Sequence, residues 1–179
     1  FHTMGIRILL CSTMINGALI NMRGFNAAEA LQLIEAEKIN SLFLVPTMFH
    51  DMLGHDSLAA TDVSTVRNVA YAGMSMTSEL ERRCIDLLHP KVLANYYGSS
   101  EIFTFTVCDH LDKKPGAAGW PGINQMIRVV RADPDGKASP DEVLAPNEIG
   151  EVIATMQSPE AFSGYWNQPD ADAKAIRDG

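Results

Sequence analysis

The chain has 179 residues, of which 46% are hydrophobic, and it carries a formal net charge of −8 at pH 7. This apolar content suffices for one ordinary domain, or for one domain with a small appendage. The acidic balance, which no cluster of lysine and arginine offsets, argues against nucleic acid or an anionic membrane as a partner.

The cysteines and the lack of a recognisable leader favour a cytoplasmic protein. Cys11, Cys84 and Cys108 are odd in number and lie among apolar residues. We expect small buried hydrophobic residues in a reducing compartment, rather than a disulfide or a metal site. No signal peptide is visible, and the apolar run at 6–15 contains Arg7 and is too short to span a membrane. The sequence begins without methionine, so we interpret it as an excerpt from a longer protein.

The first half of the chain alternates apolar runs with amphipathic segments. The length of the dense apolar run at 3–15 favours a buried helix, and a short strand is expected at 18–22. Asn26 and Glu29 predict a capped helix over 27–38, with Ala27, Ala30, Leu31 and Ile34 on one face. Further strands are expected at 41–45, 67–71 and 92–97, and further helices at 47–55 and 78–89.

The helix over 78–89 connects two of these strands. Thr77 is its expected N-cap, and the glutamates in its first turn interact favourably with the helix dipole. Its apolar side is formed by Leu80, Cys84, Leu87 and Leu88. Strands and helices that alternate through short links predict βαβ units and a parallel sheet.

The composition of the chain changes after about residue 108. Residues 112–122 are rich in glycine and proline, and residues 133–136 are a strong turn signal. Strands are expected at 125–131, with Ile127 and Val129 on one face, and at 150–155, while residues 171–177 form a polar helix. We therefore predict an α/β fold, a parallel βαβ layered sheet with a small antiparallel β region appended at the C-terminal side. The predicted boundaries are 1–108 for the α/β subdomain and 109–179 for the β-rich one.

The stretch from 95 to 101 combines groups that suit a nucleotide at the exit of a strand, where open α/β sheets bind ligands. Gly98 lacks a Cβ and lets the backbone approach a ligand closely. Ser99 and Ser100 carry hydroxyls that can donate to phosphate, and Glu101 is an oxygen ligand suited to Mg²⁺. Tyr97 offers an aromatic face for a nucleobase. Spacing alone leaves a second interpretation equally open, which is a polar β-turn.

Residues 97–101, Tyr-Gly-Ser-Ser-Glu, resemble the Tyr-Gly-x-Thr-Glu motif of the adenylate-forming enzymes. These include acyl- and aryl-CoA ligases, firefly-type luciferases and the adenylation domains of peptide synthetases. Further stretches resemble the family in the same order: 1–5, 41–47, 71–74, 116–122, 150–152 and 164–169. The resemblance covers essentially the whole chain, whereas the chain covers only the middle of the family.

The resemblance implies a role for each matching residue. Ser100, where the family usually has threonine, would contact the α-phosphate, and Glu101 would be the Mg²⁺-linked carboxylate; both are the predicted catalytic residues. Tyr97 would stack on the adenine. The residues that would border the adenine are Gly73, Met74 and Asn95. The residues that would line the acyl side are His2, Ala72, Tyr96, Gly98 and Phe103.

The activity implied by the resemblance is that of an ATP-dependent acid–thiol ligase. Such an enzyme joins a small carboxylic acid to AMP and then passes the acyl group to CoA, with ATP and Mg²⁺ as cofactors. The sequence lacks the family's Pro-Lys-Gly loop, its Tyr-x-Thr-Gly-Asp motif and its catalytic lysine, so we expect the isolated chain to be inactive. His2 and Tyr96 favour an aryl or medium-chain acid over a long fatty chain. The sequence leaves the acceptor (CoA or a carrier-protein thiol) and the oligomeric state open.

Two functions from other classes are alternatives to this one. A non-catalytic binding or scaffold protein that retains the adenylate-forming fold stays open. A dinucleotide-dependent oxidoreductase is disfavoured, because it requires a Gly-x-Gly-x-x-Gly spacing that the sequence does not contain.

Overall fold

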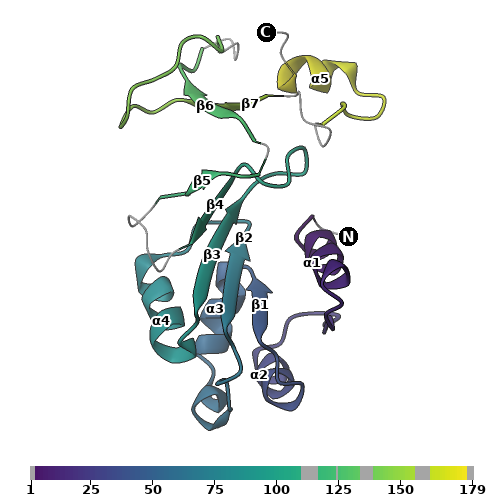
Figure 1. The fold of residues 1–179 in the computed structure, drawn as a ribbon, viewed down its shortest axis with the longest axis vertical. Helices are drawn as coiled ribbons and strands as arrows, with labels where there is room; N and C mark the ends of the chain where they lie inside the picture. Colours follow the sequence, from purple (N-terminus) through teal and green to yellow (C-terminus); the bar gives the residue numbers. More distant parts are fainter. Residues whose placement is uncertain (1–2, 110–116, 124, 134–138, 156–161, 177–179) are drawn as a thin grey trace. The chain divides into compact units, whose positions relative to one another are not determined.

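The computed structural model describes residues 3–109, 117–123, 125–133, 139–155 and 162–176. The chain forms two compact units, Phe1–Trp120 and Pro121–Gly179 (Figure 1).

The first unit is built on a five-stranded sheet with the order β1-β2-β3-β4-β5. β1 (Ser41–Leu44), β2 (Asn68–Ala72) and β3 (Val92–Tyr97) are parallel, as predicted. β4 (Thr106–Asp109) runs antiparallel to β3, and the short β5 (Trp120–Pro121) completes the sheet. The last two strands were not predicted from the sequence. The α/β class with an appended antiparallel sheet is confirmed.

Three helices, α2 (Ala27–Ala36), α3 (Pro46–Leu53) and α4 (Ser78–Leu88), contribute to a single core with the sheet. The short 3₁₀ helix η1 (Asp56–Ala60) follows α3. Successive side chains of a strand point to opposite faces, and the strand residues of this core, Leu42, Val69, Tyr71 and Leu93, share one face of the sheet. The largest fully buried side chains of this core are Phe49, Leu31, Ile34, Met52, Leu93, Val69 and Cys84.

Local signals in the sequence determine where these helices begin. The side-chain oxygen of Asn26 accepts a hydrogen bond from the Glu29 N–H at 3.0 Å, and the Thr77 hydroxyl accepts one from the Leu80 N–H at 3.3 Å. Each cap satisfies a backbone donor that the helix itself leaves unpaired. Pro46 occupies the first position of α3, where its missing N–H costs nothing. The predicted caps of α2 and α4 are confirmed.

Several predictions made from apolar runs are wrong. The helix predicted at 3–15 forms as α1 (Thr3–Met14), but none of its residues is buried, and Cys11 is exposed. No strand forms at 18–22, because no strand of the described chain pairs with that extended segment. Leu87 is 41% exposed, whereas the other predicted apolar residues of α4 are buried. An apolar run predicts burial only where another element covers it.

The second unit contains β6 (Ile127–Val130) and β7 (Glu151–Ala154), which pair antiparallel, and α5 (Pro169–Ala175). Burial does not alternate along β6, because Val130 is fully buried and Ile127 half-buried, whereas Arg128 and Val129 are both exposed. The turn predicted at 133–136 lies largely outside the described residues. Among the helices that the structure describes, none is long and apolar enough to cross a membrane.

Candidate active site

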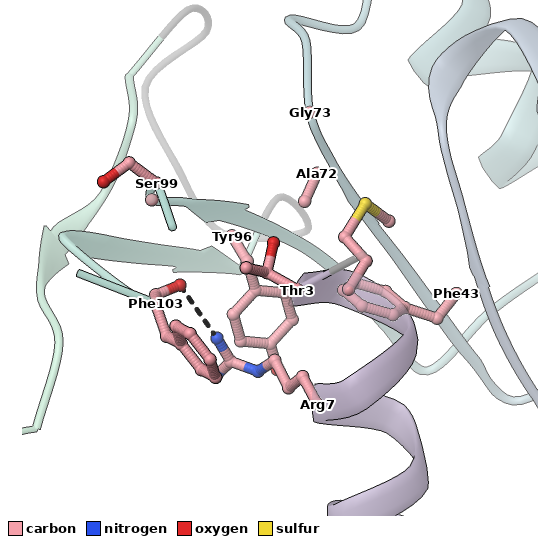
Figure 2. A pocket seen from close by; sticks show the side chains of 10 residues that line it. Thr3, Arg7, Phe43, Ala72, Gly73, Tyr96, Ser99 and Phe103 are labelled. Carbon is pink, nitrogen blue, oxygen red and sulfur yellow. Dashed lines mark hydrogen bonds between the residues drawn. The ribbon is translucent and has the colours of Figure 1, made fainter. Parts of the chain in front are cut away.

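A small pocket of about 60 Å³ lies where β2 and β3 end, on the face of the sheet opposite the helical core (Figure 2). Ala72 of β2 and Tyr96 of β3 are neighbours in the parallel register, and both point to this face. Helix α1 borders the pocket as well. The complete lining is Thr3, Met4, Arg7, Phe43, Ala72, Gly73, Tyr96, Gly98, Ser99 and Phe103.

The Tyr96 ring is held between an aromatic ring and a cation. Phe43 of β1 meets it edge to face, with ring centroids 5.7 Å apart and an interplanar angle of 88°. The Arg7 guanidinium carbon lies 4.2 Å from the centroid of the Tyr96 ring. Both contacts have the geometry that an aromatic quadrupole favours, so Tyr96 has a defined orientation in the pocket.

The loop between β3 and β4 folds back tightly on itself. The Phe105 N–H donates to the Tyr97 carbonyl at 2.7 Å, and the Ser99 N–H donates to the Ile102 carbonyl at 2.8 Å. The Ser99 hydroxyl accepts from the Ile102 N–H at 3.3 Å. This is a polar turn in which the Ser99 side chain replaces a backbone acceptor.

Gly98 is required by space rather than by backbone conformation. A Cβ there would lie 2.7 Å from the Phe103 carbonyl carbon and 2.9 Å from the Ile102 oxygen. Gly73, at the end of β2, is required for a different reason, because its φ of +89° is one that side chains other than glycine rarely adopt. Two glycines thus fix the two strand exits that border the pocket.

The predicted catalytic residues lie in this same loop but do not line the pocket. Ser100 is exposed and Glu101 is half-buried. No group of three or more metal-binding side chains occurs among the described residues. Magnesium beside a nucleotide commonly takes one or two carboxylates and completes its shell with phosphate oxygens and water. A single carboxylate at 101 fits such an ion only together with a bound phosphate.

The structure divides the predicted nucleotide residues between two faces of the sheet. Gly73 lines the pocket, whereas Asn95 and Tyr97 alternate with Tyr96 and point to the opposite face. Tyr97 is 46% exposed and stacks on Phe105, with centroids 5.5 Å apart and an interplanar angle of 28°. Met74 is 54% exposed and is not part of the lining.

The residues predicted for the acyl side come together. Ala72, Tyr96, Gly98 and Phe103 all line the pocket, while His2 lies outside the described residues. Arg7, Phe43 and the remaining pocket residues of α1 were not predicted from the sequence. The single arginine inside an apolar helix was the one signal that could have pointed to Arg7, because a charge in such a run needs a partner.

The family follows from comparison with known proteins. The family model described as "AMP-binding enzyme" matches residues 1–166. The chain belongs to the AMP-binding enzyme family. This AMP-binding chain is 28% identical to a feruloyl-CoA synthase of Amycolatopsis over the whole chain, which covers 35% of that protein. It is 31% identical to 4-coumarate–CoA ligase 5 of rice, also over the whole chain, which covers 33% of that protein.

A third relative extends the range of acids, and solved structures show the fold. The AMP-binding chain is 30% identical, over 91% of its length, to the medium/long-chain-fatty-acid–CoA ligase FadD8 of Mycobacterium tuberculosis, of which it covers 28%. The N-terminal domain of FACL13 from the same species superposes with a TM-score of 0.82 at 24% identity, over 99% of this chain and 43% of that one. A luciferase-like enzyme from the mealworm Zophobas morio gives 0.78 at 23% identity, over 93% and 39%. The chain spans about a third of the length of the curated relatives described here.

Proposed function

We propose that this chain is the central part of an ATP-dependent acyl- or aryl-CoA ligase. The parent enzyme activates a small carboxylic acid as acyl-AMP and transfers the acyl group to CoA. The curated relatives described above are CoA ligases or synthases, and their named acids include aromatic and fatty ones. This range supports the ligase class and leaves the choice between an aryl and a medium-chain acid open.

The observation that best supports the proposal is the pocket at the ends of β2 and β3. It brings together Ala72, Tyr96, Gly98 and Phe103, which belong to two separate stretches of the sequence and were all predicted to line the acyl side. Ligands of open α/β sheets bind beyond the carboxyl ends of parallel strands, and this pocket occupies such a position. We propose that it holds the organic part of the acid.

We propose that the loop after β3 binds the α-phosphate and its metal ion. An anionic carboxylate must approach an anionic phosphoryl group, so the reaction requires alignment of both and neutralisation of charge. The Ser100 hydroxyl would donate to the α-phosphate, and Glu101 would hold Mg²⁺ jointly with phosphate oxygens. The half-exposed Tyr97 would offer its ring to the adenine, bordered by Asn95 and Met74.

The proposed function can be tested on the parent protein by measuring acid-dependent exchange between ATP and pyrophosphate, and then the formation of a CoA thioester. We expect exchange with at least one acid of a panel that includes aryl, medium-chain and short dicarboxylic acids. Replacing Ser100→Ala or Glu101→Gln should lower kcat about tenfold or more, as for other groups that stabilise developing charge. The matched controls are Ser78→Ala and Glu79→Gln on the exposed start of α4, which should leave kcat unchanged. Exchange with no acid, despite binding of a nucleotide, would favour the scaffold alternative.

We propose that the isolated chain does not form acyl-AMP, because it spans only about a third of its relatives. The same exchange assay on the isolated chain should give no signal above a no-enzyme control, and robust exchange would overturn this part. We further propose a cytoplasmic location for the parent protein, since the exposed thiol of Cys11 suits a reducing compartment.

A further inference from the structure

The pocket contains one charged group in an otherwise uncharged lining. Among its ten described lining residues, Arg7 alone is charged; the others are aromatic, aliphatic, hydroxyl-bearing or glycine. Figure 2 shows Arg7 extending from α1 across the Tyr96 ring towards Phe103. Arg7 is half-buried there, so part of its guanidinium is within reach of a ligand or of water.

The partners of Arg7 use only part of its hydrogen-bonding capacity. Its Nη1 donates to the Thr104 hydroxyl and lies 3.5 Å from the Phe103 carbonyl oxygen, and its flat face covers the ring of Tyr96. A guanidinium has five N–H donors in a fixed plane. Within the part of the chain that the structure describes, Nε and Nη2 donate to no acceptor.

A guanidinium with a free edge discriminates between acyl groups. A saturated chain that enters the pocket would take water from Nε and Nη2 and replace it with nothing, which leaves buried donors unpaired. A carboxylate would instead accept two parallel hydrogen bonds from that edge, the strongest arrangement available to arginine. The described part of the pocket is small, about 60 Å³, which matches a short acid.

We propose that Arg7 is the specificity-determining residue of the acyl pocket and selects compact acids that carry a second anionic group at the end remote from the reacting carboxyl. Short dicarboxylic acids are the substrate class that best fits this chemistry. The inference rests on the proposed ligase function, because it assumes that the pocket receives the acid. It adds to that function the class of acid and the residue that recognises it.

The test compares succinate, 4-hydroxybutanoate and butanoate, which share a four-carbon chain and differ only at the remote end. In the parent protein, kcat/KM for thioester formation should fall in that order, with succinate at least tenfold above butanoate. Arg7→Met should lower kcat/KM for succinate tenfold or more and raise it for butanoate, with KM for ATP unchanged. Arg7→Lys, which keeps the charge and loses the planar fork, should give an intermediate ratio. Arg82→Met, an exposed arginine of α4 outside the pocket, is the matched control and should leave the ratio unchanged.

Two results separate the failure of this inference from the failure of the proposed function. Activity with other acids but a succinate-to-butanoate ratio that Arg7→Met does not change would overturn the inference and leave the ligase intact; Arg7 would then only attach α1 to the sheet. Calorimetric titration of succinate into the parent protein with AMP bound provides a readout without turnover. Binding that Arg7→Met weakens tenfold supports the inference even in the absence of exchange, and equal binding by both proteins overturns it.

Discussion

Replacing Gly98 by alanine tests the tight packing of the loop between β3 and β4. The new Cβ would lie 2.7 Å from the Phe103 carbonyl carbon, whereas ordinary contact begins at 3.4 Å. The backbone would have to move by at least about 0.7 Å, because the Phe103 carbonyl oxygen lies closer still, and this backbone is held by the hydrogen bonds from Ser99 to Ile102 and from Phe105 to Tyr97. Overpacking of this kind costs about 1–3 kcal/mol, and a lost hydrogen bond adds about 1 kcal/mol, so we expect a loss of about 2–4 kcal/mol.

The matched control is Gly5→Ala in α1. A Cβ at Gly5 meets nothing within 4 Å, and alanine is favoured over glycine inside a helix by about 0.5–1 kcal/mol. Urea unfolding of the parent protein should therefore shift to lower denaturant for Gly98→Ala and slightly to higher denaturant for Gly5→Ala. Acid-dependent exchange should fall only in the first variant. Unfolding of Gly98→Ala within about 0.5 kcal/mol of the wild type would refute the close approach of Gly98 to Phe103.

Three further predictions concern the rest of the first unit. An alanine at Gly73 has room for its Cβ but must adopt the same φ of +89°, so Gly73→Ala should lose about 1–2 kcal/mol of unfolding free energy. Gly73→Asn should lose less, because asparagine tolerates a positive φ better than alanine does. Equal losses in the two variants would contradict the conformational explanation. Burial raises the pKa of the Cys84 thiol to about 12 and also raises that of the Tyr71 phenol. The unfolded thiol ionises first, so stability should hold below pH 9 and then fall by about 1.4 kcal/mol per pH unit for this group; urea midpoints that stay flat from pH 9 to 10.5 would contradict it. Asn26→Ala removes the cap of α2 and should cost about 1 kcal/mol in the same unfolding assay, whereas an unchanged midpoint would show that the cap is dispensable.

Local chemistry explains which parts of the fold could be predicted from the sequence. Asn26, Thr77 and Pro46 act on neighbouring backbone groups, so their positions are visible without knowledge of the tertiary structure. The parallel order of β1 to β3 follows from the alternation of strands with helices. The exposure of α1 and the failure of 18–22 to form a strand depend on which elements pack against them, and an apolar run does not contain that information.

The site was predictable to the extent that it depends on strand ends. Ala72 and Tyr96 come together because two parallel strands end side by side. The alternation of side chains along a strand could already have separated Tyr96 from Asn95 and Tyr97. Arg7 could not be placed in this way, because its contacts with the loop join residues 96 and 97 positions apart, and only the tertiary fold brings them together.

The most direct test of the central claim is the acid selectivity of the parent protein after Ala72→Leu. Ala72 is buried and lines the pocket, so a larger side chain there would take up space that the acid would otherwise use. If this pocket receives the acid, ATP–pyrophosphate exchange should fall about tenfold or more for the largest acid accepted and much less for the smallest, with KM for ATP unchanged. An equal effect on every acid, or none, would contradict the assignment of the acid to this pocket.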